Sequence, residues 1–161
     1  MKTNASIFCL FFTLTIFSSC KSSKELSSKD NRIEFTEIKS GLNCNYNSFT
    51  TIEIYDSKKL NTVWANLFAK YDRKPPIPTI DFEKNMLIAI ALGERNSGSY
   101  SLQVESIIEN KNNIKVIIDE NKPGPSCITP SVMIYPFQLI KISLPKKPIT
   151  YVKVLKIKDC K

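Results

Sequence analysis

The sequence predicts an α+β domain that is mainly antiparallel β, with about seven strands and one amphipathic helix packed on the sheet. One stretch alone has apolar residues at helical spacing, whereas several shorter stretches alternate like strands or form short apolar runs. A length of 161 residues suits one folded domain. Many strands beside a single helix favour antiparallel pairing, so we expect all of these elements in one α+β unit.

The expected helix follows Asp56 and Ser57, either of which can cap its first turn. Its apolar residues recur at steps of three and one, so they form one stripe over about four turns. The stripe consists of Leu60, Val63, Trp64, Leu67, Phe68 and Tyr71. Because Trp64 lies in the middle of the stripe, we expect it in the core rather than at a ligand. Three prolines in 72–79 end the helix and favour an extended connection.

Two strands are expected before the helix, at 33–38 and 51–55. Five more follow it, at 86–92, 100–108, 114–118, 132–142 and 149–157. The run at 86–92 is almost continuously apolar, which is typical of a strand buried on both faces. In 100–108 we expect the even-numbered side chains on one side.

The last two expected strands, 132–142 and 149–157, are close in sequence, so we predict a hairpin across 144–148. Proline cannot donate a backbone hydrogen bond to a neighbouring strand. Pro136 therefore predicts an edge position or a bulge for the first of the two.

The amino terminus carries an export signal. Lys2 precedes an apolar run at 7–17, which is too short to span a bilayer. Ser18, Ser19 and Cys20 follow, and small residues before a cysteine resemble the lipobox of a bacterial lipoprotein. We expect residues 1–19 to be a signal peptide, 20–32 the lipidated Cys20 with a flexible tether, and 33–161 one globular domain. The alternative is a secretory signal cleaved nearby, with Cys20 an ordinary thiol.

Fatty acyl chains such as palmitate on Cys20 would anchor the chain to a membrane. The residues after Cys20 are basic and polar rather than acidic, which favours the periplasmic side of the outer membrane over surface display. The net charge of +8 suggests lysines on solvated strand faces. Because an exported protein does not meet nucleic acid, we expect no nucleic-acid partner.

Composition excludes several reaction classes. Without histidine the chain cannot form a Ser-His-Asp triad, a Cys-His pair or a zinc site with His ligands. Its carboxylates form no recognisable acid and base pair, and its four glycines lie too far apart for a phosphate-binding loop. The sequence predicts a binding protein rather than an enzyme, with no catalytic residue, metal or cofactor.

Two loops carry the most distinctive motifs, GERNSGSYS at 93–101 and KPGPSCIT at 122–129. The second is followed by Tyr135-Pro136-Phe137 and an Ile-Lys-Ile run. This order of loops and strands resembles the carboxy-terminal domain of the PrcB family, over residues 82–144. Those proteins are subunits of protease complexes, and the best-described kind is a lipoprotein that binds and stabilises a secreted protease. The family's usual loop is Thr-Gly-Gly-Tyr, so Ser99 replaces its second glycine.

The resemblance implies a membrane-tethered, non-catalytic module that binds a protease as its partner. Arginine and tyrosine at a loop tip are typical anchors of interfaces. The partner-binding residues we predict are Arg95, Asn96, Ser97, Ser99, Tyr100, Gly124, Pro125 and Tyr135. The alternative for Gly98 and Tyr100 is a turn at the entry of a strand. Other candidate functions are a loop-based protease inhibitor and a small-molecule or glycan-binding envelope protein.

After Cys9 is lost and Cys20 lipidated, three cysteines remain in an oxidising compartment. The expected terminal hairpin places Cys160 opposite residue 132, at the end where Cys127 lies. This geometry favours a Cys127–Cys160 disulfide over the two other pairings, with Cys44 left as a plain thiol.

Overall fold

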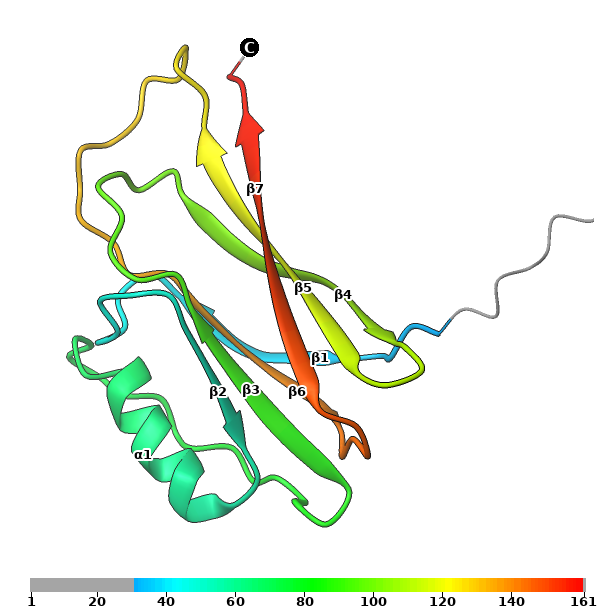
Figure 1. The fold of residues 1–161 in the computed structure, drawn as a ribbon. Helices are drawn as coiled ribbons and strands as arrows, with labels where there is room; N and C mark the ends of the chain where they lie inside the picture. The colour runs from blue at the N-terminus through cyan, green and yellow to red at the C-terminus, as the bar shows by residue number, and fades with distance from the viewer. Residues whose placement is uncertain (1–30, 161) are drawn as a thin grey trace, which may run out of the picture.

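The computed structural model describes residues 31–160, which form two β-sheets and one helix in three layers (Figure 1). The strands and the helix run in chain order as β1 (Thr36–Gly41), β2 (Thr50–Ile54), α1 (Ser57–Leu67), β3 (Asn85–Ala91), β4 (Ser101–Glu109), β5 (Ile114–Pro123), β6 (Phe137–Ser143) and β7 (Ile149–Lys158). The predicted α+β class, with about seven strands and one helix, is confirmed. The predictions for residues 1–30, lipidation of Cys20 among them, lie outside the described residues.

The first sheet has four strands in the order β1-β6-β3-β2, and all of its neighbours are antiparallel. The second sheet has the order β4-β5-β7, in which β4 and β5 are antiparallel and β5 and β7 are parallel. Helix α1 covers the face of the first sheet that is turned away from the second (Figure 1). The four-stranded sheet is therefore the middle layer.

Helix α1 begins after Asp56, whose side chain accepts a hydrogen bond from Lys59 N at 2.7 Å. Its stripe packs against β3 and β6, and Trp64 is buried in that core with its indole N–H donating to Pro75 O at 3.0 Å. The helix ends at Leu67, one turn earlier than the stripe predicts. Phe68 and Tyr71 follow in a turn, where Phe68 still packs between Trp64 and Phe137.

Strand β3 lies between the two cores. Leu87, Ala89 and Ala91 face α1, whereas Met86, Ile88 and Ile90 face β4 and β5. This position explains the continuous apolar run and confirms the prediction of a strand buried on both faces.

The predicted terminal hairpin is wrong. Strand β6 already pairs with β1 on one edge and β3 on the other, so it has no free edge for the next strand. The chain crosses at 144–148 to the second sheet, where β7 runs parallel to β5 from Ile149 beside Ile114 to Lys158 beside Pro123.

The edge position inferred from Pro136 is also wrong. Strand β6 is central and begins at Phe137, directly after Pro136. Because Pro136 lies outside the strand, its missing N–H removes no hydrogen bond between strands. The carbonyl of Pro136 instead accepts a hydrogen bond from Leu92 N at 2.9 Å. Residues 132–135, predicted as part of this strand, form only isolated bridges, of Ile134 with Arg95 and of Tyr135 with Asn43.

A bulge in β4 changes the predicted alternation. Leu102 and Val104 face inward as expected, but the register to β5 shifts between Val104 and Ser106. Ile107, rather than Ser106, then occupies the core at 1 % exposure. At the start of the chain, β1 begins at Thr36 rather than 33, and Ile33 N donates to Ile107 O at 2.8 Å beside β4.

Candidate partner-binding surface

The first motif loop leaves β3 through Gly93, which has a φ of +80°. A Cβ at this position would lie 2.7 Å from backbone atoms of Asn47 and Ser48, so both the conformation and the space require glycine. Gly98 and Ser99 do not have positive φ, because Gly93 is the residue with that conformation within 31–160. Serine in place of the family's second glycine is therefore free of backbone strain here.

Backbone hydrogen bonds join the first motif loop to the segment that precedes β6. Arg95 and Ile134 exchange two of them, at 2.9 and 2.8 Å, and Gly98 N donates to Pro130 O at 3.3 Å. A turn follows at Ser97, whose carbonyl accepts from Tyr100 N and whose hydroxyl accepts from Ser99 N. We call residues 94–100 and 125–135 together the loop surface.

The structure places the predicted partner-binding residues at three depths. Asn96, Ser99 and Pro125 are exposed. Arg95, Tyr100 and Tyr135 are half-buried, and Ser97 and Gly124 are buried. Gly124 lies against Asp159, whose carboxylate occupies the space of a Cβ at this position. Of the predicted set, the exposed three and the rims of the half-buried three are accessible to a partner.

Arg95 turns inward rather than standing at the loop tip. Its Nε donates to Glu120 Oε1 at 2.7 Å, and Lys153 Nζ lies 2.8 Å from Glu120 Oε2. Glu120 is buried, which by itself raises the pKa of its carboxyl, but the hydrogen bonds and charges of Arg95 and Lys153 outweigh burial and hold that pKa below its ordinary value. This group ties the first loop to β5 and β7.

Tyr135 sits between an acid and a base. Its hydroxyl donates to Glu94 Oε2 at 2.8 Å, and Lys70 Nζ lies 3.2 Å from the centre of its ring. The bond to the carboxylate raises the pKa of the Tyr135 hydroxyl, so the tyrosine stays protonated at neutral pH. Glu94 and Lys70 were not among the predicted residues. Lys70 lies just past α1, and nothing in the local sequence pairs it with Tyr135.

Exposed apolar side chains also belong to this end of the molecule. Ile128, Val132 and Met133 are exposed on the loop surface, and Leu42, whose carbonyl accepts from Tyr135 N, is exposed beside it. Grouped apolar side chains in contact with water are typical of interaction surfaces. The strand predicted at 132–142 would place Val132 and Met133 in a sheet, so their exposure in a loop was not predicted.

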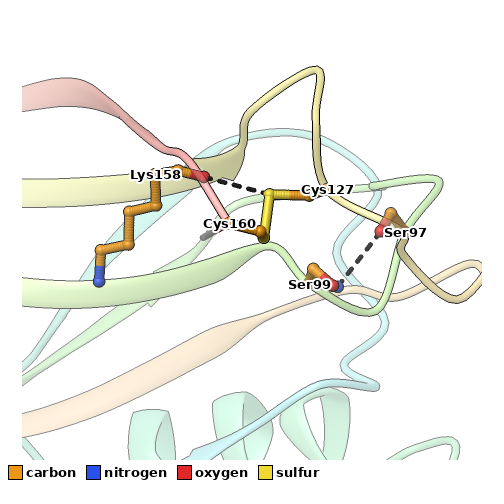
Figure 2. The surroundings of a disulfide bond; sticks show 5 residues. All are labelled: Ser97, Ser99, Cys127, Lys158 and Cys160. Carbon is orange, nitrogen blue, oxygen red and sulfur yellow. Dashed lines mark hydrogen bonds between the residues drawn. A yellow bond between two sulfur atoms is a disulfide. The ribbon is translucent and has the colours of Figure 1, made fainter.

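The predicted Cys127–Cys160 disulfide is present, with the two Cα atoms 5.0 Å apart. Figure 2 shows it beside Ser97 and Ser99, with Cys127 Sγ 3.4 Å from Lys158 O. A disulfide sulfur has no proton, so this is a close contact rather than a donated bond. The pairing is right although the hairpin used to infer it is wrong, because the parallel β5–β7 pair also brings residue 160 to the end of β5.

Cys44 is the free cysteine within 31–160 and is fully buried. Burial raises the pKa of its thiol, so it remains protonated at neutral pH.

A cleft of about 250 Å³ between the sheets is lined by residues of β1, β4 and β6, with Leu42 and Pro136. Within residues 31–160, no three His, Cys, Asp or Glu side chains gather closely enough to hold a metal ion, and no helix is long and apolar enough to cross a membrane.

The segment that carries this geometry can be compared with known families. Residues 86–143 match the PrcB C-terminal family. The resemblance inferred from the motif loops is thereby confirmed, and the PrcB C-terminal segment runs from β3 to the end of β6. It contains all of the loop surface and the disulfide cysteine Cys127. Neither the curated proteins nor the solved structures contain a significant match to the chain.

Proposed function

We propose that this protein is a membrane-anchored lipoprotein whose domain is a non-catalytic binding module for a protease of the cell envelope or a secreted protease. The single observation that carries the proposal is the match of residues 86–143 to the PrcB C-terminal family. As the resemblance described above implies, proteins of this family are subunits of protease complexes. The match covers the residues that build the loop surface, so the family relationship concerns the part of the molecule with exposed apolar groups.

The loop surface has the make-up of a binding site for a protein. Ile128, Val132 and Met133 supply exposed apolar area, and Asn96 and Ser99 supply polar groups at its rim. The backbone hydrogen bonds between Arg95 and Ile134, together with the Arg95–Glu120 ion pair, fix the two segments of the loop surface relative to each other in the absence of a partner. A surface that is ordered in advance binds at a lower entropic cost.

The position of residue 31 supports anchoring through the amino terminus. Asn31 O accepts from Glu109 N at 2.7 Å, so the described chain begins at the end of β4 where the turn to β5 starts. The loop surface lies at the opposite ends of these strands, one strand length away, and β4 has nine residues. A lipid on Cys20 would thus attach the domain by the end opposite the loop surface, which leaves that surface free for a partner. We place the domain on the periplasmic side of the outer membrane.

Site-specific photo-crosslinking of the full chain in its own envelope tests the proposed partner. A photoreactive residue at Asn96 on the loop surface is expected to capture a protease, whereas one at Lys58, exposed on the first turn of α1, captures none. Longer survival of that protease in the presence of the chain supports a stabilising subunit. Loss of its activity would point instead to an inhibitor, and capture of a non-protease at Asn96 would overturn the proposal.

The lipid anchor has its own test. Growth with an alkyne fatty acid is expected to label the wild-type chain and not the Cys20→Ala variant. Labelling that persists in the variant would overturn the assignment of Cys20.

A further inference from the structure

Four strand edges border the two sheets, and three of them are short, interrupted or covered. Strand β1 has six residues and a register shift between Glu37 and Lys39, and β2 has five residues. The outer edge of β4 carries a bulge and is covered by residues 32 and 33, which bridge to Ile108 and bond to Ile107 O. Such features prevent a sheet from adding a further strand.

Strand β7 is the exception. It has ten residues, pairs with β5 without a register shift, and has no strand on its other side within residues 31–160. Seven successive residues from Val152 to Lys158 are exposed. Among them Leu155 and Ile157 are 55 % and 63 % exposed, so apolar area lies open beside unpaired backbone.

Both ends of β7 are held. At its start Thr150 Oγ1 bonds to Ile114 O, and at its end Cys160 is joined to Cys127 while Lys158 O accepts from Gly124 N at 2.8 Å. Figure 2 shows the Lys158 side chain pointing away from the disulfide. The disulfide therefore fixes the end at which an exposed edge strand would otherwise fray. An ordered edge is a better template for an incoming strand than a mobile one.

Charge determines which segment fits this edge. Strand β7 contains Lys153, Lys156 and Lys158 and no acidic residue. Lys153 and Lys156 pair with Glu120 and Asp119 of β5, but each ammonium has three donors, and Lys158 is exposed beyond them. A second copy of β7 would bring six lysines onto one ladder, which disfavours self-pairing.

We propose that the free edge of β7 accepts an extended segment of a partner protein as an additional strand, and that this segment alternates acidic with apolar residues. Its backbone would pair with the outer edge of β7. Because side chains alternate between the two faces of a strand, its carboxylates would meet Lys156 and Lys158 on one face, and its apolar residues would contact Leu155 and Ile157 on the other. This edge is separate from the loop surface, and the proposal does not require the partner to be a protease.

The probe is a fluorescent synthetic peptide of about eight residues in which valine and glutamate alternate, a length that suits one strand. It is titrated with the full chain in detergent solution while anisotropy is recorded. Replacing its glutamates by lysines is expected to weaken binding at least about tenfold, because like charges then meet. Equal binding of the two peptides would contradict the charge argument.

Backbone methylation of the peptide separates strand addition from simple contact. A strand at an edge uses the N–H groups of every second residue for pairing. Methylating one alternate set is therefore expected to reduce affinity more than about tenfold, while methylating the other set leaves it nearly unchanged. Equal effects of the two sets would overturn strand addition.

Two protein variants localise the binding. Lys158→Glu is expected to weaken the acidic peptide about threefold to tenfold, while Lys58→Glu, the same charge change on α1, has no effect. If the two variants weaken binding equally, the peptide is bound by net charge alone and the proposal fails. If the free chain instead forms a dimer in sedimentation that protects β7 amides from exchange, the occupant is a second copy, which also overturns it.

Discussion

Strands β3 and β7 are both rich in apolar residues, yet one is the most buried strand of the molecule and the other the most exposed. From Met86 to Ala91 every residue of β3 is buried, whereas from Val152 to Lys158 every residue of β7 is exposed. The difference comes from position, because β3 has a strand on each side and a layer on each face, while β7 has one neighbour. Strands of similar apolar composition therefore have different roles, since β3 stabilises the core and β7 forms an exposed edge.

The largest expected effect is in β3. Leu87→Ala removes a side chain with no exposed area from the core beneath α1, and we expect a loss of about 2 to 5 kcal/mol in the free energy of unfolding. Urea denaturation followed by tryptophan fluorescence measures it. A loss below about 1 kcal/mol would contradict the layered core, since such a cost is typical of surface sites.

The disulfide comes next. Its cysteines are separated by 33 residues, and replacing both with serine is expected to cost about 3 to 4 kcal/mol through the entropy of the unfolded chain. Because β3 amides exchange only through global unfolding, the same variant should also exchange them faster, by the factor that this loss of stability implies. Peptide mapping without reductant should recover a peptide pair linked through Cys127 and Cys160, and a linked peptide containing Cys44 would contradict the structure.

A smaller, pH-dependent effect is expected at Glu120, which ties β5 to β7 and to Arg95. At pH 7 Glu120→Gln should lose about 1 to 3 kcal/mol, because the neutral amide cannot match a charge-assisted bond. The folded pKa of Glu120 is depressed, so its stabilisation is present above the ordinary carboxyl value of 4.5 and is lost as the pH falls through the folded value.

Urea denaturation of both proteins between pH 7 and pH 3 checks this dependence. The gap between wild type and Glu120→Gln should narrow with acid. Glu83→Gln should match wild type at pH 7, because Glu83 is exposed and surface substitutions usually change stability by less than about 0.5 kcal/mol. A gap for Glu120→Gln that stays constant with pH would show that its charge is not what stabilises the fold.

The smallest expected loss of stability is that of Leu155→Ala in β7, the variant that matches Leu87→Ala in β3. Leu155 is half exposed, so the expected cost is below about 0.5 kcal/mol. Measured under the same conditions, the two variants should differ by at least about 1.5 kcal/mol. Similar costs would mean that β7 is covered in solution.

Features that depend on local periodicity were predictable. The stripe through Trp64 and the run at 86–92 specify a helix face and a doubly buried strand, and the structure has both. Strand pairing was not, because the alternation in 149–157 is the same whether its neighbour is β6 or β5. The hairpin is excluded only because β1 and β3 already occupy both edges of β6, and the spacing of apolar residues in the sequence does not show which edges are occupied.

The candidate site was predictable to a similar extent. Glycine, serine and asparagine marked the loop, and Asn96 and Ser99 are exposed there. Arg95 is instead held by Glu120, 25 residues further along, and Tyr135 by Glu94, 41 residues away. Such contacts follow from the way the sheets meet, so they were beyond prediction from neighbouring residues.

Amide hydrogen exchange of the full chain, read residue by residue, is the most direct test of the contrast between a closed interior and an open edge. The amides of β3 should exchange only through global unfolding, while in β7 every second amide, the set not bonded to β5, should exchange rapidly. Uniform protection of β7 equal to that of β3 would contradict the open edge.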